Sequence, residues 1–551
     1  MPAPINLMKK NILLSIISGL LLWVAWPPAN NTTFILFIAM VPLFVAFENI
    51  IQSELKRKGR KVFWTAFLGF FIWNTLSVYW VYNALKSDGE LVAIPVTLIP
   101  YSLGPILMAF VCWLYYRARL IMNRSLALIA FGIFWIGYEY LNQCWDLKFP
   151  WMNLGNGFAM VQNWIQWYEF TGIYGGSVWI LVVNILTFLT YISFKEKKQK
   201  EIKLKLALAC SAVLVLPITY SLYRYNTYQE FVNPANIVIA QPNIDPYAKV
   251  SSIPVDKQVA ILTKLSDSLG QHNTEFFIWP ESAMPNFISE ENVRTDASFL
   301  QAQHFLSKFK NGNIITGIST YKLYNTRATE TASKFNPEGT IFFDSFNSAL
   351  NIENSAQVQF YHKSKLVPGA EALPFGEALS FLKPVFEHLG GATGAYGTQK
   401  SPGVFYSQSG IGVVPVICYE TIYGDWIADA VHKGAQFIAI ITNDGWWENT
   451  SGKDQHLDYA KLRAIENRRW VCQSANTGIS AFINQRGDVV TKTKWWVKTA
   501  IKQNINLNSD LTFYTLHGDF IAKTISIIAI MFILLLTAMN IMKRKKLDNQ
   551  I

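Results

Sequence analysis

The sequence predicts a membrane-embedded bundle of α-helices that carries an extracytoplasmic α/β domain. Hydrophobic residues make up 51% of the 551 residues and charged residues only 15%, proportions that are typical of membrane proteins. The apolar residues are concentrated in 11–222 and 518–542, whereas 230–515 has the mixed composition of a globular domain. This division predicts a membrane bundle over 1–223, a globular domain over 230–515, a last membrane helix over 518–542 and a basic tail over 543–551.

Eight apolar runs are long enough to cross a bilayer, since a helical crossing takes about 20 residues. The predicted spans are 11–28, 33–50, 62–84, 91–116, 125–144, 168–194, 204–222 and 518–542. The first run ends in Trp26-Pro27-Pro28 and not in small residues, so we expect it to be retained and not cleaved as a signal peptide. The fourth run contains Pro95, Pro100 and Pro105 and is expected to be the least regular.

Lysine and arginine mark one side of the predicted membrane. They cluster in alternate loops and at the C-terminus, at Lys56, Arg57, Lys58, Arg60, Lys61, Arg117, Arg119, Arg124, Lys195, Lys197, Lys198, Lys200, Lys203, Lys205 and Lys543, Arg544, Lys545, Lys546. Because basic loops stay in the cytoplasm, both termini are predicted to be cytoplasmic and 230–515 to face outward. The net charge of +11 is therefore a topology signal, and the absence of a basic stripe in the globular part argues against a nucleic-acid partner.

One outward loop, 148–157, combines aromatic residues with two glycines. The aromatic residues fit an interfacial belt. Gly155 and Gly157 would also allow the backbone to pass close to a ligand or to the globular domain. The sequence leaves both interpretations open.

Short apolar strands alternate with amphipathic helices in the globular part, which predicts an α/β layered fold. The expected strands are 236–240, 276–279, 313–318, 349–352, 357–361, 413–417, 437–442, 471–474 and 479–483, and the expected helices lie near 255–270, 296–309, 425–433 and 457–469.

Three reactive side chains follow separate predicted strands. Glu281 follows Trp279-Pro280, Lys363 follows Tyr361-His362, and Cys418 follows the apolar run 413–417. A thiol becomes a strong nucleophile only as a thiolate. A carboxylate can remove its proton, and an ammonium group can stabilise the negative charge that develops. The three residues therefore predict a Glu-Lys-Cys catalytic set.

Each of these residues also has a structural interpretation. Cys418 fits a buried core residue, Glu281 a helix cap and Lys363 a surface side chain. A disulfide between Cys418 and Cys472 would silence the thiol in an extracytoplasmic domain. Cys112, Cys144 and Cys210 lie in or beside apolar runs and are expected to be small core residues. The chain has no CxxC pair and no Cys/His spacing typical of zinc, so no metal site is predicted.

Several motifs resemble the nitrilase, or carbon–nitrogen hydrolase, superfamily. They are Trp279-Pro280-Glu281-Ser282-Ala283, Tyr361-His362-Lys363-Ser364-Lys365-Leu366-Val367-Pro368 and Ile417-Cys418-Tyr419-Glu420, supported by Thr442-Asn443-Asp444-Gly445-Trp446, Arg463-Ala464-Ile465-Glu466 and Asn476-Thr477-Gly478-Ile479-Ser480. With seven spans before the domain and one after it, nearly the whole chain resembles the apolipoprotein N-acyltransferase family. The resemblance implies an αββα globular domain.

The resemblance also implies a mechanism and its partners. Cys418 would be the nucleophile, Glu281 the general base and Lys363 the oxyanion stabiliser. Cys418 would take an acyl chain from a phospholipid as a thioester and pass it to the amine of a diacylglyceryl apolipoprotein. The implied location is the bacterial inner membrane, with the catalytic domain on the periplasmic side. No cofactor is expected, and the chain is expected to act as a monomer.

The resemblance assigns supporting positions as well. Glu371 matches a second family glutamate by its spacing from Lys363, although Glu377 competes for the role. Tyr419, Glu420, Pro374 and Gly155 fall on positions that line or shape the site.

Two other functions remain open at this stage. A membrane-tethered amidase would use the same three residues with water as the second nucleophile, but a small polar substrate does not require eight spans. A transporter or scaffold with a degenerate outer domain would not need the Glu-Lys-Cys set. Such a transporter would also be expected to carry charged residues inside its spans, where Glu48 and Glu139 are among the few.

Overall fold

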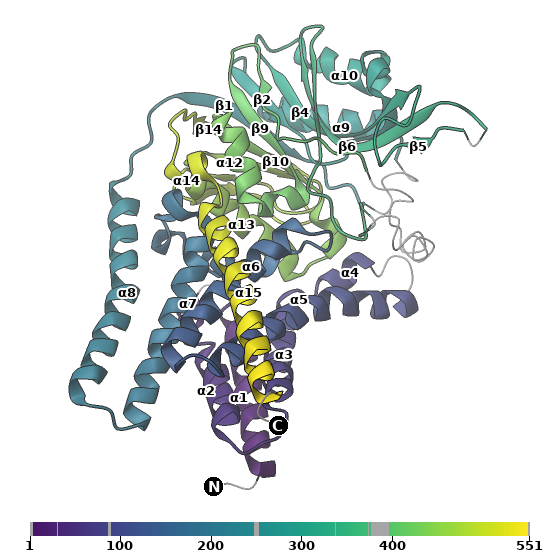
Figure 1. Ribbon diagram of the computed structural model, residues 1–551. Coiled ribbons are helices and arrows are strands. Elements are labelled where there is room, and N and C mark those ends of the chain that lie inside the picture. The colour runs from purple at the N-terminus through teal and green to yellow at the C-terminus, as the bar shows by residue number, and fades with distance from the viewer. Residues whose placement is uncertain are drawn as a thin grey trace. The chain divides into compact units, whose positions relative to one another are not determined.

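The computed structural model describes residues 4–29, 31–85, 90–246, 253–336, 338–372, 374–375 and 396–548 (Figure 1). The chain divides into two compact units. The helical unit comprises Met1–Tyr79, Ile94–Arg224 and Asp519–Ile551, and the α/β unit comprises Trp80–Ala93 and Tyr225–Gly518. The segment Trp80–Ala93, which the sequence places in the membrane region, therefore groups with the α/β unit.

Long helices make up most of the helical unit. They are α1 (Pro4–Val24), α2 (Val41–Gln52), α3 (Lys58–Ser77), α5 (Glu90–Arg119), α6 (Arg124–Cys144), α7 (Tyr168–Lys195), α8 (Lys200–Thr227) and α15 (Phe520–Asp548). Short 3₁₀ helices connect some of them: η1 (Thr33–Phe37), η3 (Pro150–Met152), η4 (Leu154–Phe158) and η5 (Gln162–Trp164).

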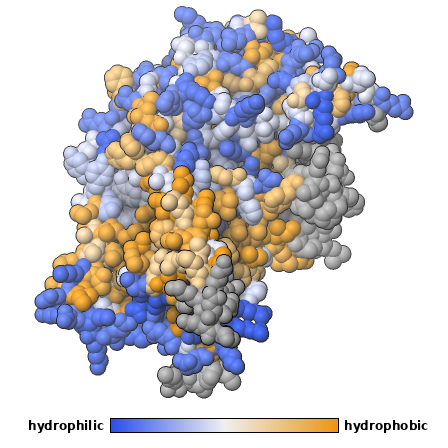
Figure 2. Space-filling model, in the orientation of Figure 1, coloured by the Kyte–Doolittle hydropathy of each residue, from blue (hydrophilic) through white to orange (hydrophobic). Residues whose placement is uncertain are grey.

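Seven helical stretches in the described part of the chain are long and apolar enough to cross a membrane. They are Asn6–Val24, Thr33–Gln52, Thr97–Arg119, Arg124–Cys144, Tyr168–Lys195, Lys200–Thr227 and Phe520–Met539. In Figure 2 apolar residues cover the visible surface of this unit, with hydrophilic residues gathered at its lower end. Helix α3, which corresponds to the predicted span 62–84, is not among the seven; it has 20 residues and carries Lys58, Arg60 and Lys61 in its first turn.

The predicted span 62–84 ends earlier than expected, because α3 stops at Ser77. Beyond it, Trp80 is only 4% exposed and belongs to the α/β unit. Its indole nitrogen donates to Gln455 Oε1 at 3.1 Å, and its ring lies 4.8 Å from that of Trp447. The short helix α4 (Val81–Leu85) follows. These contacts hold Trp80 within the α/β unit, so the apolar run does not continue as a membrane helix.

Two other helices are more continuous than the sequence suggests. Helix α5 runs as one element through Pro95, Pro100 and Pro105, the span expected to be least regular. Helix α15 extends to Asp548, so residues predicted as a tail after 542 prolong the last helix.

Two β-sheets form the centre of the α/β unit. The first has the order β14 (Thr499–Asn506), β1 (Pro234–Gln241), β2 (Thr274–Ile278), β4 (Asn313–Tyr324), β6 (Phe342–Glu353) and β5 (Ser333–Lys334), with β3 (Met284–Ser289) paired to β4 and β7 (Val358–His362) paired to β6. The second has the order β13 (Val489–Lys492), β12 (Ala481–Ile483), β11 (Val471–Ala475), β10 (Phe437–Thr442), β9 (Gly412–Ile417) and β8 (Phe405–Tyr406).

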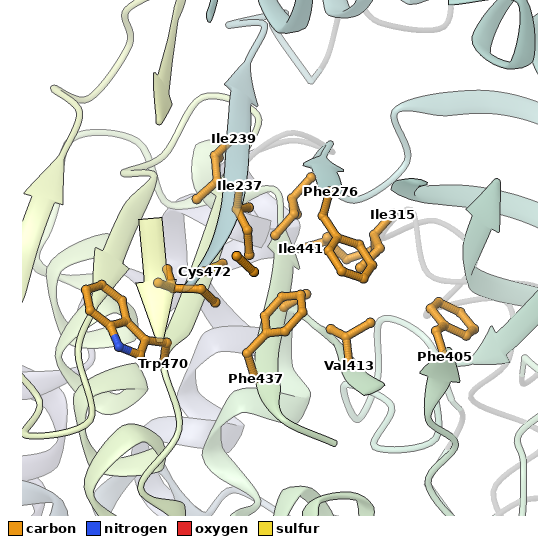
Figure 3. Close-up of a cluster of buried hydrophobic side chains, with 14 of the residues drawn as sticks. Ile237, Ile239, Phe276, Ile315, Phe405, Val413, Phe437, Ile441, Trp470 and Cys472 are labelled. Atoms are coloured by element: carbon orange, nitrogen blue, oxygen red, sulfur yellow. The ribbon is translucent and has the colours of Figure 1, made fainter. Parts of the chain in front are cut away.

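The sheets pack face to face through apolar side chains. Figure 3 shows Ile237 and Phe276 of the first sheet pointing toward Phe437 and Ile441 of the second. The rings of Phe276 and Phe437 have centroids 5.1 Å apart. Each such side chain contributes about 1.5–3 kcal/mol when it leaves water, so this core holds the two sheets together.

Helices cover the outer face of each sheet. The first sheet packs against α9 (Val255–Leu269) and α10 (Ala297–Leu306), and the second against α12 (Gly424–His432) and α13 (Ser451–Asn467). The resulting α–β–β–α layers agree with the domain that the sequence resemblance implies. The short α14 (Phe513–His517) ends the unit.

The central strands β1, β2, β4, β9, β10 and β11 lie where the apolar runs predict them. The strands that the sequence did not predict are β3, β5, β8, β13 and β14. Strand β14 pairs antiparallel with β1, so that Ile505 lies opposite Ala235. Its sequence is largely polar, so only this pairing with a strand about 270 residues away identifies it.

All five cysteines are free. Cys472 lies fully buried in the core between the sheets, on β11. The disulfide between Cys418 and Cys472 considered from the sequence is therefore absent.

Candidate active site

Cys418 lies at a sharp turn directly after β9, whose residues are all buried. Its φ of +50° is in the left-handed region, which costs a residue with a side chain roughly 1–2 kcal/mol. The turn continues as the 3₁₀ helix η8 (Cys418–Ile422), in which Thr421 Oγ1 donates to the Cys418 carbonyl oxygen at 2.8 Å. Strained turns of this kind persist only where the surrounding structure enforces them, and they are common at functional sites.

Glu281 is held by a close backbone contact after β2. Gly317 of β4 donates its N–H to the Pro280 carbonyl oxygen at 3.1 Å, and a Cβ at Gly317 would lie 2.6 Å from Glu281 Cα. The Glu281 side chain is 7% exposed, and its Oε1 accepts from Asn347 Nδ2 at 2.8 Å. Glu281 is therefore fixed at both its backbone and its carboxylate.

Lys363 directly follows β7 and is only 1% exposed. Its Nζ lies 2.7 Å from Glu371 Oε1 and 3.4 Å from Glu281 Oε1. Burial alone would lower the pKa of Lys363, but the charges of Glu281 and Glu371 outweigh burial and raise the pKa well above its ordinary value. Lys363 therefore stays protonated at every physiological pH.

The structure brings the three predicted catalytic residues together: Lys363 Nζ lies 3.4 Å from Glu281 Oε1, and the charges of both residues act on the Cys418 thiol. Burial raises the pKa of this thiol, the charge of Glu281 raises it further, and Lys363 partly offsets the rise. The resting residue is thus a neutral thiol. Glu281 is the carboxylate whose charge acts most strongly on this thiol.

Glu371, and not only Glu281, binds the ammonium group of Lys363. Its Oε1 also accepts from Asn347 Nδ2 at 3.3 Å, while Oε2 accepts from the Val367 N–H at 2.9 Å. Its place beside Lys363 fits the supporting role expected from the spacing, while Glu377 lies outside the described residues. Asn347 was missed in the sequence, although extending the predicted hairpin by two residues would have placed it across from Lys363.

Glu420 connects the Cys418 turn to the strand end that carries Lys363. Its Oε2 accepts from Tyr361 Oη at 2.8 Å and from the Ile417 N–H at 3.0 Å, and its Oε1 accepts from the Ser364 N–H at 2.8 Å. Burial raises its pKa, and these hydrogen bonds act in the opposite direction. Glu420 is therefore a positioning residue that couples the two sheets at the site.

The remaining predicted positions differ in what surrounds them. Tyr419 follows Cys418, is 6% exposed and packs against Tyr423 with ring centroids 5.7 Å apart. Pro374 is buried, but 373 and 376–395 lie outside the described residues. Gly155 belongs to the helical unit, where its N–H donates to Ser177 Oγ at 2.9 Å.

The structure gives Gly155 a packing role. A Cβ there would lie 1.9 Å from the Ile173 carbonyl oxygen, so only glycine allows η4 to approach α7 this closely. A substrate-lining role for Gly155 stays a prediction.

A buried pair beside the Cys418 turn was also not predicted from the sequence. His456 of α13 and Asp444 of η9 (Asp444–Trp447) are both fully buried. His456 Nδ1 lies 2.9 Å from Asp444 Oδ1, and Nε2 lies 3.1 Å from the Cys418 carbonyl oxygen. The sequence predicts a helix that begins only at 457, which leaves His456 in an expected loop. In the structure α13 begins at Ser451, six residues earlier, so His456 lies on the helix. In the described part of the chain, no cluster of His, Cys, Asp and Glu has the arrangement of a metal site.

Replacing His456 with asparagine is expected to lower kcat about tenfold to a hundredfold with little change in KM, because misplacing a reacting group by about 1 Å can cost a hundredfold. Asp444→Asn should act through the same contact, so the double variant should be little worse than either single variant. His432→Asn changes an exposed histidine of α12 and is the matched control. Fully additive effects would show that the pair does not act as a unit.

Replacing Gly317 with alanine is expected to reduce activity strongly and to destabilise the α/β unit by about 1–3 kcal/mol, the usual cost of overpacking. The new Cβ would lie 2.4 Å from the Ser282 backbone nitrogen, so the Glu281 turn has to move. At Gly403 the nearest atom, Tyr361 Cδ2, is 3.6 Å away, so Gly403→Ala should change neither activity nor Tm. Wild-type activity in Gly317→Ala would contradict the backbone positioning of Glu281.

Two family matches cover most of the chain. Residues 18–186 match the apolipoprotein N-acyltransferase N-terminal domain, and residues 239–509 match the carbon–nitrogen hydrolase domain. The second match contains Glu281, Lys363 and Cys418.

The relatives match this chain across both of these regions. The chain is 27% identical over 527 residues to an apolipoprotein N-acyltransferase of Chlorobaculum tepidum, with 94% of each chain covered. It is 26% identical to an enzyme of the same name from Geobacter metallireducens, covering 93% of each, and 24% identical to one from Pasteurella multocida, covering 86% of this chain and 87% of that one. The two domain matches in this order, and relatives that match over nearly their whole length, show that the chain belongs to the apolipoprotein N-acyltransferase family.

Proposed function

We propose that the protein transfers an acyl chain from a membrane phospholipid to the N-terminal amine of a diacylglyceryl apolipoprotein, through a thioester on Cys418 and without a cofactor. The observation that carries the proposal is the cluster of Glu281, Lys363 and Cys418 in a chain whose helices can cross a membrane. An enzyme that takes acyl chains from a bilayer benefits from being held in it, because an acyl chain leaves the membrane only at a cost of about 0.8 kcal/mol per methylene.

In the first half-reaction, Glu281 removes the proton from Cys418 Sγ while the sulfur attacks the carbonyl carbon of the sn-1 ester. The negative charge on the carbonyl oxygen is stabilised by Lys363 Nζ and by the N–H of Tyr419. The ester C–O bond then breaks, Glu281 returns the proton to the departing oxygen, and the lysophospholipid leaves.

In the second half-reaction, the α-amine of the diacylglyceryl-cysteine attacks the thioester carbonyl carbon. Glu281 accepts a proton from the amine, the C–S bond breaks, and the proton passes to Cys418 Sγ. The products are an N-acylated lipoprotein and the free thiol. The site has to exclude water during this interval, since hydrolysis of the thioester would waste the acyl group.

The proposed setting is the bacterial inner membrane. Helix α3 would provide an eighth crossing beside the seven helical stretches that are long and apolar enough. The basic loops would lie in the cytoplasm together with both termini, which places the α/β unit on the periplasmic side. The chain is proposed to work as a monomer.

This orientation predicts different labelling of two exposed lysine positions. In a Cys144→Ser background, Lys308→Cys in the α/β unit should react with a membrane-impermeant maleimide in intact spheroplasts, because its side chain is 57% exposed. Lys198→Cys, 51% exposed after α7, should react only once the membrane is permeabilised. The reverse pattern would contradict the proposed orientation.

Acyl transfer can be measured with a phospholipid that carries a labelled sn-1 chain and with a diacylglyceryl-cysteine peptide. The label is expected in an amide at the peptide N-terminus, with lysophospholipid as the second product. Hydrolysis of small amides without transfer to the peptide would instead support a membrane-tethered amidase, which uses the same three residues.

A further inference from the structure

A groove lies between α5 and α15 of the helical unit, far along the chain from the catalytic residues. Its volume is about 250 Å³, and it is lined by Trp113, Leu114, Arg117, Ile533, Leu536, Thr537 and Ile541. Helix α15 packs on α6, where Ala529 Cβ lies 3.0 Å from the place that a Cβ added to Gly137 would occupy. The groove therefore has apolar walls from two membrane helices and one cationic residue.

Arg117 is the charged residue among the described residues that line this groove. Its guanidinium lies 5.3 Å from the centre of the Trp113 ring, and its Nε is buried without a hydrogen-bond partner. Among the described residues no carboxylate forms an ion pair with it. The Nε atoms of Arg119 and Arg124 are also buried without a partner, but both of these arginines pair with Glu48, at 3.3 and 2.6 Å.

An unpaired cation against apolar walls is costly, so such a residue usually has a partner. The missing partner has to be an anion that brings apolar groups with it, because the groove around Arg117 is lined mainly by apolar side chains. Helix α15 continues directly into Lys543-Arg544-Lys545-Lys546, a basic sequence that attracts anionic lipid surfaces.

We infer that this groove binds an anionic phospholipid, with the phosphate at Arg117 and part of an acyl chain between α5 and α15. A planar guanidinium can donate two hydrogen bonds to one phosphate group, which a lysine cannot do. The site is separate from the acyl-transfer chemistry, because none of its residues belongs to the α/β unit. The inference therefore does not depend on the proposed function.

Native mass spectrometry of the full-length protein tests this inference directly. The protein is incubated with phosphatidylglycerol, with phosphatidylcholine of the same chains, or with inorganic phosphate. Wild type should retain one phosphatidylglycerol at least fivefold more than phosphatidylcholine, and Arg117→Gln should lose this preference. Lys203→Gln removes another cation that stacks on an aromatic ring, 5.1 Å from Phe194, and should retain the lipid like wild type.

A second variant separates the groove from the charge. Ile533→Trp keeps Arg117 but fills the space, so it should also lose phosphatidylglycerol while remaining a folded monomer by gel filtration. Equal retention in wild type, Arg117→Gln and Ile533→Trp would overturn the site. Binding of inorganic phosphate in place of the lipid, or equal retention of the two lipids, would overturn its assignment to an anionic phospholipid.

Discussion

Lys363→Met is expected to lower the rate of acyl transfer about a hundredfold to a thousandfold, the usual effect of losing one oxyanion donor. The same change leaves the carboxylates of Glu281 and Glu371 without their shared cation. Removing one partner of a buried ion pair costs about 3–5 kcal/mol, so Tm should fall as well. Loss of activity without loss of stability is not expected here, because Lys363 also pairs with two carboxylates.

Lys365→Met is the matched control, because Lys365 lies two residues further on and its Nζ is 4.6 Å from the centre of the Trp426 ring. It removes the same charge close to the site and should keep most of the activity and the wild-type Tm. Equal losses in the two variants would mean that Lys363 acts only through the general charge of the region.

The charge on Lys363 also sets how stability depends on pH. Its pKa is raised in the folded protein, so its contribution is fully present below the ordinary pKa of lysine. That contribution is lost only as the pH rises toward the higher pKa of the folded state. Wild type should therefore lose stability in strongly alkaline solution, and Lys363→Met should show less of this loss.

Glu281→Gln is expected to lower acyl transfer about a hundredfold to ten-thousandfold, because it removes the general base. The glutamine oxygen can still accept hydrogen bonds from Asn347 and Lys363, so the fold should be retained. The reactivity of the Cys418 thiol toward an alkylating reagent should rise, although the rate of acyl transfer falls. Glu281 raises the pKa of Cys418, so its removal lowers that pKa, and iodoacetamide should alkylate Cys418 faster at pH 8.

Glu353→Gln is the control for this experiment, since it removes a buried carboxylate from the far end of β6. It should change neither the transfer rate nor the alkylation rate. A parallel fall of both rates in Glu281→Gln would show that Glu281 generates a thiolate in the resting enzyme, contrary to the general-base account.

Much of this arrangement is predictable from the sequence where a local signal exists. Buried parallel strands such as β9 and β10 are continuous apolar runs, and they place Cys418 at a strand end. The end of α3 was not predictable, because Val78, Tyr79 and Trp80 are as apolar as a membrane helix. Only the contacts of Trp80 with Trp447 and Gln455 decide that the helix stops.

Prediction of the site residues from the sequence is limited in the same way. Glu281, Lys363 and Cys418 each lie in a recognisable motif, whereas Asn347 and His456 do not. Their roles arise from strand register and helix packing: the Lys363 N–H donates to the Asn347 carbonyl oxygen at 2.8 Å, and α13 carries His456 to the carbonyl oxygen of Cys418. Such contacts join residues that are far apart in the chain, so no local pattern records them.

The central claim is a thioester between Cys418 and an acyl chain taken from a phospholipid. Intact mass spectrometry of the purified protein after incubation with phosphatidylethanolamine tests it most directly, beside Cys418→Ala. The account predicts a mass gain of one acyl group that hydroxylamine removes and that Cys418→Ala lacks. No gain with any phospholipid, together with turnover of small amides, would contradict it.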